Sequence, residues 1–348
     1  MDRVLRVLVV DDSAYVRKVV KQMLSRSPFI EVVGVARDGQ EALEMAEQLS
    51  PDVVTCDLIM PVMDGVAFVR AQMQRRPLPI VIVSIANDGS EMALTALDAG
   101  AVDFVQKPTA LATEKIFEVS DELIEKVKAA ASVPMSRLHP VLTGEPASEI
   151  AALDGPRAGL IDLIVLGIST GGPQALKYMI PQLPADFPVP LVMVMHMPVG
   201  YTEMYAQRLN EIARLEVAEA REGDEIRAGL VLLAPAGRHL TLRRTSTGRV
   251  VAHLDARPFD ALHRPSVDVL FQSAAEIFRD RTLGVVMTGM GVDGKQGAAW
   301  IKSQGGMVFT EAEASCVVYG MPRAVVEGGL SDRTVPLELM AKAILEVI

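Results

Sequence analysis

Short apolar runs alternate with amphipathic segments along most of the chain, and this pattern predicts strands separated by helices. Residues 39–49 illustrate the helical segments, because Ala42, Leu43, Ala46 and Leu49 recur at helical spacing. Strands that are apolar at nearly every position are typical of parallel sheets with helices on both faces. In the first part of the chain we expect strands at Leu5–Val10, Glu31–Ala36, Val53–Cys56, Ile80–Ser84 and Phe104–Gln106.

The pattern stops and later resumes, which predicts two domains joined by a linker. Residues 132–156 carry scattered Pro, Gly, Ser and Ala without sustained periodicity. We therefore predict a first domain at residues 1–125, a linker at 126–158 and a second domain at 159–348. Both domains are expected to be α/β with a doubly wound parallel sheet. In the second domain the clearest strands are expected at Leu163–Ile168, Leu191–Met195, Gly229–Ala234, Leu283–Met287 and Met307–Thr310.

Composition excludes several classes of protein. The net charge of −10 argues against a nucleic-acid surface, because neutralising phosphates needs clustered Lys and Arg. We expect no membrane insertion, since no run of about 18 apolar residues occurs and the first residues lack a signal-peptide layout. Cys56 and Cys316 are too few for a disulfide framework or a cysteine-based zinc site. These features predict a cytoplasmic protein.

Acidic and basic side chains follow the strands of the first domain. Asp11 and Asp12 come at the end of the first strand, and Asp57 follows the third. Because ligands of doubly wound sheets bind at the carboxyl edge of the strands, these carboxylates are expected to converge there. Mg²⁺ is the natural partner of such a group, since it prefers hard oxygen ligands. Ser84 ends the fourth strand, and Lys107 follows the fifth with an ammonium able to neutralise a phosphate.

An ordinary structural interpretation of the acids is open, because an Asp pair after a strand is commonly a helix N-cap or a solvated turn. The set as a whole favours a ligand site. The stretches "VLVVDDSAYVRK", "VVTCDLIMPVMDG" and "FVQKP" resemble the receiver domain of two-component response regulators. The resemblance implies a flavodoxin-like fold, with Asp57 phosphorylated by a chemotaxis histidine kinase. It also implies Mg²⁺ ligands at Asp11, Asp12, Asp57 and the carbonyl of Ile59, and phosphoryl contacts from Ser84 and Lys107.

A serine opens the second domain's first predicted helix. In "LIVLGISTGGPQAL", Ser169 lies between an apolar strand and the glycines that precede Pro173. The ordinary interpretation is an N-cap hydroxyl. The functional one is a nucleophile on a tight strand-to-helix turn, where backbone N–H groups and the helix dipole can stabilise an oxyanion.

Two further strands end in a histidine and an aspartate, which favours the nucleophile. "PLVMVMHMPVG" places His196 at a strand end, and "LGVVMTGMGVDG" places Asp293 just beyond another. A serine hydroxyl needs a base to take its proton, and the base needs a carboxylate to orient it. The G-x-S-x-G match around Ser169 allows an α/β-hydrolase alternative that uses His263 as the last triad member. That alternative needs an acid such as Asp224 or Asp255 before His263, and neither follows a recognisable buried strand, so Ser169, His196 and Asp293 form the better set.

The segment "TGMGVDG" also spells the dinucleotide-binding pattern, with glycines 289, 291 and 294 followed by Glu311. Physical reasoning argues against that function, because Asp293 would place a carboxylate beside a pyrophosphate at the helix N-terminus. We expect Glu311 to be an ordinary surface acid at a strand end. The glycines are predicted instead to shape a turn that directs Asp293 at His196.

The second domain resembles the CheB-type protein-glutamate methylesterase family in the stretches "GISTGGP", "MHMP", "LAPAGRHL", "RPSVDVLF", "MTGMGVDG" and "GMPRAV". The resemblance implies a Rossmann-like domain that needs no cofactor, releases methanol from glutamate methyl esters of chemoreceptors and deamidates receptor glutamines. Thr170 and Met290 are the candidate oxyanion donors. The remaining histidines considered, His239, His253 and His263, are expected to be structural or on the surface.

The order of receiver, linker and esterase domain implies a monomer that is switched on by phosphorylation, the unphosphorylated receiver covering the cleft. Three other classes of protein compete with this interpretation. A non-enzymatic signalling module is disfavoured by retention of the whole Ser, His and Asp set. A transcription factor is disfavoured because the second domain lacks a short helix-turn-helix layout and a basic face. A dinucleotide-dependent oxidoreductase is disfavoured by Asp293.

Overall fold

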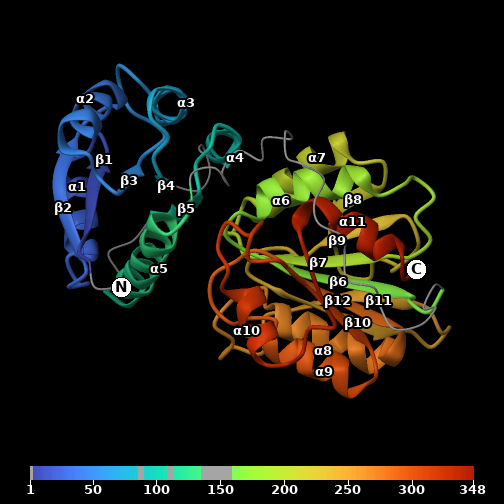
Figure 1. Cartoon of the computed structure of the whole chain (residues 1–348). Coiled ribbons are helices and arrows are strands. Elements are labelled where there is room, and N and C mark those ends of the chain that lie inside the picture. Colours follow the sequence, from blue (N-terminus) through green and yellow to red (C-terminus); the bar gives the residue numbers. More distant parts are fainter. Residues whose placement is uncertain (1–2, 85–89, 108–112, 135–158) are drawn as a thin grey trace. The chain divides into compact units, whose positions relative to one another are not determined.

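The computed structural model describes residues 3–84, 90–107, 113–134 and 159–348, and the chain divides into two compact units, residues 1–141 and 142–348. Most of the predicted linker lies in residues 135–158, outside the described residues, so the domain boundaries predicted from the sequence stay predictions. Figure 1 colours the chain from the first unit, in blue and teal, to the end of the second, in red.

The first unit is a parallel sheet in the strand order β2-β1-β3-β4-β5, the order of flavodoxin-like folds. Its predicted strands are confirmed to within one residue at each end. The strands are β1 (Leu5–Val10), β2 (Ile30–Ala36), β3 (Val53–Cys56), β4 (Ile80–Ser84) and β5 (Asp103–Gln106). The helices are α1 (Ala14–Leu24), α2 (Gly39–Leu49), α3 (Gly65–Arg75), α4 (Ser90–Asp98) and α5 (Thr113–Ala131).

Local sequence signals set where these helices begin. Ser13, Asp38 and Asp64 are the N-caps of α1, α2 and α3, and each side chain accepts a hydrogen bond from a backbone N–H in the first turn. Helix α3 starts tightly against the end of β3, because a Cβ on Gly65 would lie 2.2 Å from the carbonyl oxygen of Asp57. This close contact fixes the segment between β3 and α3 against Asp57.

The second unit is a larger parallel sheet, ordered β14-β13-β12-β6-β7-β9-β8, with a separate antiparallel hairpin. The sheet strands are β6 (Leu163–Ile168), β7 (Leu191–Met195), β8 (Glu216–Glu219), β9 (Leu230–Leu233), β12 (Thr282–Val286), β13 (Met307–Glu311) and β14 (Arg333–Val335). The hairpin pairs β10 (His239–Arg244) with β11 (Val250–Asp255). The helices are α6 (Gly172–Met179), α7 (Thr202–Ile212), α8 (Val267–Phe278), α9 (Lys295–Ser303), α10 (Met321–Glu327) and α11 (Leu337–Leu345), with short 3-10 turns at Ile180–Gln182 and Arg279–Arg281.

Helices cover both faces of the second sheet, with α6, α7 and α11 on one side and α8, α9 and α10 on the other (Figure 1). Helix α8 packs very closely on β6. A Cβ on Gly167 would lie 2.3 Å from a methyl carbon of Val267, so only glycine permits this approach. The contact brings the N-terminus of α8 to the carboxyl edge of the sheet, where the second unit's candidate residues lie.

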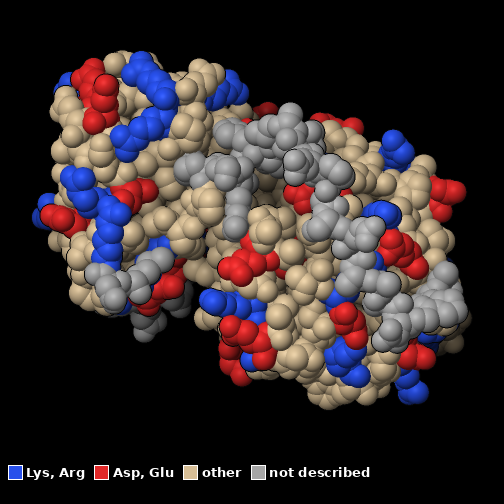
Figure 2. Space-filling view, in the orientation of Figure 1, with Lys and Arg blue, Asp and Glu red and all other residues tan. Residues whose placement is uncertain are grey.

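Charged side chains of both signs share the visible face of the molecule (Figure 2). Acidic and basic side chains are interspersed in small groups on the visible face (Figure 2), in keeping with the net charge of −10. In the described part of the chain, no helix combines the length and apolar character needed to cross a bilayer.

Candidate functional site

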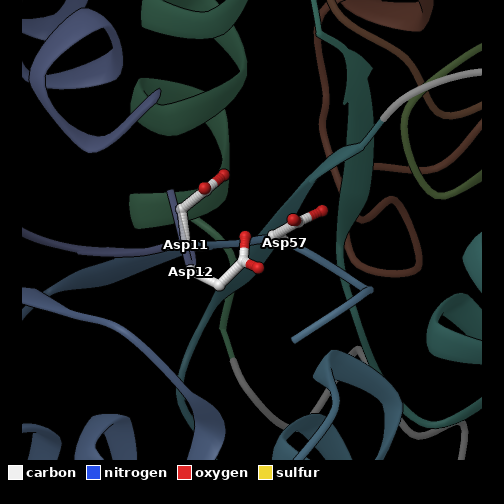
Figure 3. A group of neighbouring side chains, drawn as sticks. All are labelled: Asp11, Asp12 and Asp57. Carbon is white, nitrogen blue, oxygen red and sulfur yellow. The ribbon is translucent and has the colours of Figure 1, made fainter. Parts of the chain in front are cut away.

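The first unit brings its predicted acids together at the carboxyl edge of the sheet. Asp11, Asp12 and Asp57 each offer an oxygen, and these oxygens lie within 4.8 Å of one another (Figure 3). Asp11 and Asp57 are buried, whereas Asp12 is exposed. They extend from the ends of β1 and β3, which are neighbours in the sheet. The parallel arrangement thus produces the convergence that the sequence predicts.

Lys107 holds this cluster together. Its Nζ lies 2.6 Å from Asp11 Oδ2 and 2.7 Å from Asp57 Oδ2. Burial raises the pKa of Asp11, and the bond to Lys107 opposes that shift without cancelling it. Burial alone would lower the pKa of Lys107, but its bonds to Asp11 and Asp57 raise it above the usual value. The ammonium therefore stays charged and neutralises part of the acidic group.

Ser84 has a buried hydroxyl without a hydrogen-bond partner among the described residues. Buried polar atoms are normally satisfied, so an orphan hydroxyl beside an acidic cluster is a feature that a ligand completes. The acids are not N-caps of α1, since Ser13 fills that position and Asp11 instead accepts the N–H of Ser13 at 2.9 Å. Three converging carboxylates with one lysine leave a negative excess, and this oxygen set fits a hard divalent cation such as Mg²⁺.

In the second unit, Ser169 lies in the turn between β6 and α6. Helix α6 has Gly171 as its N-cap, with no side-chain cap, so Ser169 is not the N-cap hydroxyl of the ordinary interpretation. Gly171 adopts a φ of +81°, and a Cβ there would also lie 2.5 Å from Val317. The turn is closed by the N–H of Gly172, which donates to the Ser169 carbonyl at 2.7 Å. The half-buried Ser169 is thus held at the opening of α6.

Thr288, in the segment after β12, connects that turn to the glycine-rich loop. The Ser169 N–H donates to the Thr288 carbonyl at 2.9 Å, and Thr288 Oγ1 donates to the Thr170 carbonyl at 2.9 Å. A Cβ on Gly289 would lie 2.7 Å from the Cβ of Ser169. The turn that carries Ser169 and the glycine-rich loop after β12 are therefore packed tightly against each other.

His196 follows β7 directly, and its ring is held by Asp293. His196 Nε2 and Asp293 Oδ2 are 2.8 Å apart. The other ring nitrogen, Nδ1, is buried and has no hydrogen-bond partner among the described residues. One ring nitrogen of His196 thus faces a carboxylate, and the other has no partner among the described residues.

Asp293 is also the cap of a helix that comes from another part of the chain. Its Oδ2 accepts the N–H of Val267 at 2.8 Å, and its Oδ1 accepts the N–H of Asp268 at 2.9 Å and the hydroxyl of Ser266 at 3.0 Å. Burial alone would raise the pKa of Asp293, but the bond and charge of His196 and these N–H donors hold it well below its usual range. The carboxylate is therefore ionised, oriented and placed at the positive end of α8.

Asp268 caps the N-terminus of helix α9 in the same way. Its Oδ1 accepts the N–H of Gly294 at 2.9 Å and that of Gly297 at 2.7 Å. Burial, together with the nearby charge of Asp293, raises the pKa of Asp268. Helices α8 and α9 therefore cap each other: Asp293, just before α9, accepts from the start of α8, and Asp268, in the first turn of α8, accepts from the start of α9.

Two histidines outside the predicted set support this site. His239 is fully buried; its Nδ1 accepts the N–H of Ser266 at 3.2 Å and its Nε2 faces the Pro258 carbonyl at 3.1 Å. Burial lowers the pKa of His239, so it is a neutral structural group. His263 lies directly on the ring of His196, with centroids 4.0 Å apart. Sequence reasoning missed this contact, because His263 lies in an irregular segment whose course no periodicity predicts.

One expectation from the sequence is wrong. Glu311, expected to be a surface acid, is fully buried at the end of β13. It accepts the N–H of Thr288 at 2.9 Å and the hydroxyl of Ser315 at 3.0 Å. The segment after β13 folds back over the strand end, which removes the carboxyl from water. A buried Glu311 cannot bind the ribose of a dinucleotide, so the dinucleotide-binding interpretation lacks the acidic residue that it requires.

The α/β-hydrolase alternative also finds no support in the geometry. Asp255 ends β11 and pairs with Arg257, and Asp224 accepts the N–H of Arg221. The acid that His196 faces is Asp293, and His263 stacks on His196. A serine, a histidine bonded to a buried acid and a helix N-terminus at one sheet edge are typical of serine hydrolases.

Comparisons with known proteins agree with this class. Residues 164–344 match the family model described as CheB methylesterase, and residues 7–118 match that of the response regulator receiver domain. A relative from Myxococcus xanthus (strain DK1622), called protein-glutamate methylesterase/protein-glutamine glutaminase 5, is 52% identical, covering 97% of this chain and 96% of its own. One from Symbiobacterium thermophilum, with the same name but no number, is 45% identical over 100% and 98%.

A solved structure is similar as well. The catalytic domain of the CheB methylesterase of Thermotoga maritima is 41% identical with a TM-score of 0.53, covering 54% of this chain and 99% of that one. The chain belongs to the CheB methylesterase family, with a response regulator receiver domain preceding the esterase domain.

Proposed function

We propose that this protein is a phosphorylation-activated serine hydrolase that removes methyl groups from glutamate methyl esters of chemoreceptors. It releases methanol, and it deamidates receptor glutamines by the same acyl transfer with ammonia as the leaving group. The names of the relatives describe both activities. The observation that carries the proposal is the hydrogen bond between His196 Nε2 and Asp293, which leaves the buried Nδ1 without a partner among the described residues.

In the proposed reaction, Ser169 Oγ attacks the ester carbonyl carbon while its proton passes to His196 Nδ1. The tetrahedral intermediate collapses, the carbon–oxygen bond to the methoxy group breaks, and the proton on His196 passes to the leaving methanol. Water then attacks the acyl-enzyme with His196 again as base, which regenerates Ser169 and the free glutamate. Asp293 holds the imidazole and stabilises its protonated form, because its carboxylate is ionised and fixed by the N-terminus of α8.

The oxyanion would be stabilised by backbone N–H groups near Thr170 and Met290. These residues lie on the two segments that Thr288 and Gly289 join, so both segments are held against Ser169. Preorganised donors of this kind lower the barrier because they need no rearrangement as charge develops. Removing one such donor in a serine protease costs about 10²–10³ in kcat.

In the first unit, we propose that Asp57 accepts a phosphoryl group from a chemotaxis histidine kinase. Asp11, Asp12 and Asp57, with the Ile59 carbonyl, would hold Mg²⁺, which would stabilise charge on the transferred oxygens. Lys107 and the orphan Ser84 hydroxyl are suited to contact the phosphoryl oxygens. Phosphorylation is proposed to raise esterase activity in the cytoplasm, with the protein acting as a monomer.

The test of the activity is methanol release from methylated chemoreceptor membranes incubated with the full chain. Ser169→Ala is expected to lose this release. Ser246→Ala, at an exposed position of the β10–β11 turn, is the matched control and is expected to keep it. Circular dichroism and the fluorescence of Trp300, the single tryptophan, show whether each variant folds. A normal rate in folded Ser169→Ala would contradict the proposed function.

A further inference from the structure

Glu311 is a fully buried carboxyl group that the proposed reaction does not use. It is the last residue of β13, a strand that pairs with β12 on one side and with β14 on the other. Burying a carboxyl group is costly unless its oxygens are hydrogen-bonded. Both oxygens of Glu311 have donors: Oε2 receives the Thr288 N–H at 2.9 Å, and Oε1 receives the Ser315 hydroxyl at 3.0 Å.

Thr288 transmits this interaction to the nucleophile turn. Its N–H is held by Glu311, its carbonyl accepts the N–H of Ser169, and its Oγ1 donates to the Thr170 carbonyl. The N–H of Val318 donates to Thr288 Oγ1 at 3.0 Å, which ties in a third segment. A shift of the Thr288 peptide would therefore move Ser169 and the start of the oxyanion loop together.

The groups that face Glu311 do not include a neutralising cation among the contacts described. The segment after β13 contributes the Ser315 hydroxyl and the buried thiol of Cys316, and α11 contributes the charge of Glu338. On neighbouring β14, Arg333 is bonded to Glu346 and lies over Phe309. Burial foremost, and Glu338 to a lesser degree, raise the pKa of Glu311 to about 7.

We propose that Glu311 is a positioning residue, whose carboxylate fixes the Thr288 peptide and thereby the geometry of Ser169 and the oxyanion loop. This proposal rests on the proposed function of Ser169. The ionised carboxylate accepts both hydrogen bonds, and bonds to an ionised acceptor are stronger than neutral ones. When Glu311 is protonated, the Thr288 bond becomes a neutral one, and the Ser315 hydroxyl has the Ala312 carbonyl, at 3.2 Å, as an alternative acceptor.

Two substitutions of Glu311 distinguish the effect of its hydrogen-bond acceptor from the effect of its charge. Glu311→Gln keeps an oxygen that accepts the Thr288 N–H, whereas Glu311→Met has a similar length and no acceptor. We expect kcat for methanol release to fall roughly ten- to a hundredfold in Glu311→Met, with little change in KM, because a buried donor is left unsatisfied. Glu311→Gln, which keeps the acceptor but not the charge, is expected to have a kcat at pH 8 between those of wild type and Glu311→Met. Equal kcat values for wild type and Glu311→Met would overturn the proposal.

The pH profile supplies a readout that a purely structural role would not move. In the wild type, lowering the pH from 8 to 6 protonates Glu311 and weakens its bond to the Thr288 N–H, so kcat is expected to fall more steeply than in Glu311→Gln, where residue 311 does not titrate. Profiles of the same steepness would contradict a role for the ionised carboxylate.

A measurement without turnover keeps this proposal separate from the proposed function. The amide proton of Thr288, followed by NMR in the isotope-labelled full chain, is expected to move upfield as Glu311 is protonated between pH 8 and pH 6. In Glu311→Gln the same resonance should stay in place. A Thr288 resonance that does not respond to pH in the wild type would refute the coupling, even if Ser169→Ala abolishes methanol release. If Ser169→Ala stays active while Thr288 responds, the proposed function alone is wrong.

Discussion

Replacing Asp293 by alanine should cost folding stability as well as activity, because this carboxylate is the cap of α8. In the alanine variant, the N–H groups of Val267 and Asp268 lose the acceptors that now lie 2.8 and 2.9 Å away. The Gly294 N–H keeps Asp268 as a second acceptor, and the Ser266 hydroxyl can rotate toward another partner. The net loss is therefore two unsatisfied backbone donors in a buried place.

Each unsatisfied buried donor costs about 1–3 kcal/mol, so we expect Asp293→Ala to lower the free energy of unfolding by about 4 kcal/mol. Relief of the repulsion between Asp293 and Asp268 offsets a small part of this loss. Asp293→Asn keeps one oxygen acceptor but turns an amide NH₂ toward the remaining donors, and about half of the loss is expected. Both variants should lose esterase activity, since neither supplies a carboxylate to His196.

Urea unfolding followed by Trp300 fluorescence measures this prediction within the full chain. Trp300 is the single tryptophan and lies on α9, which packs against α8, so its signal reports the second unit alone. Asp186→Ala, an exposed acid of the same unit, is the matched control and should change stability by less than about 0.5 kcal/mol. If Asp293→Ala were as stable as this control, the capping argument would be refuted.

Three further predictions follow from the structure. The carboxyl of Glu311 has a pKa of about 7 in the fold against 4.5 for its ordinary value, so the folded state binds more protons and stability falls as pH rises from 4.5 to 7. The free energy of unfolding of wild type relative to Glu311→Gln should therefore drop by about 3 kcal/mol across that window. Gly289→Ala should reduce methanol release about a hundredfold, because its Cβ would lie 2.7 Å from the Cβ of Ser169 and displace it. Removing Mg²⁺ with a chelator should abolish stimulation by a small phosphodonor and leave basal esterase activity intact.

For each of these three predictions, a specific result or control variant would show whether it is wrong. A constant difference between wild type and Glu311→Gln across the pH range would refute the buried titration. Gly289 does not have a positive φ, so the expected loss there comes from the contact of the new Cβ and not from backbone strain. Gly200→Ala, at a φ of +95° with no neighbour within 4 Å, shows what backbone strain alone does. Chelator-resistant stimulation would argue against the metal site, and Asp57→Asn, which should not be stimulated at all, gives the baseline.

The parts of the molecule that the sequence predicts are those governed by local rules. Strands such as Leu163–Ile168 are buried at every position, and this shows directly as an apolar run. The convergence of Asp11, Asp57 and Lys107 follows from one rule, that parallel strands end at the same edge. For the same reason, the sequence alone predicts that Ser169 and His196, which each follow a parallel strand, lie at the same edge of the sheet.

The remaining features depend on segments that meet only in three dimensions. Glu311 reads as a surface acid because its burial is produced by the segment that follows it and by Thr288, not by its own strand. The capping of α8 by Asp293 is equally invisible in the sequence, since cap and helix belong to different segments. The short strands Glu216–Glu219 and Arg333–Val335 lie at sheet edges, where polar residues hide the apolar pattern.

The strand order of the second unit has a consequence for how the protein is made. Strand β12 lies beside β6, yet Thr282 leaves the ribosome long after Leu163 has appeared. Until then one edge of β6 is unpaired, and an exposed strand edge is a site for association with other chains. Ser169 is synthesised well before Asp293, so under the proposed roles an unfinished chain has no working esterase, and its unpaired edge is exposed to other chains.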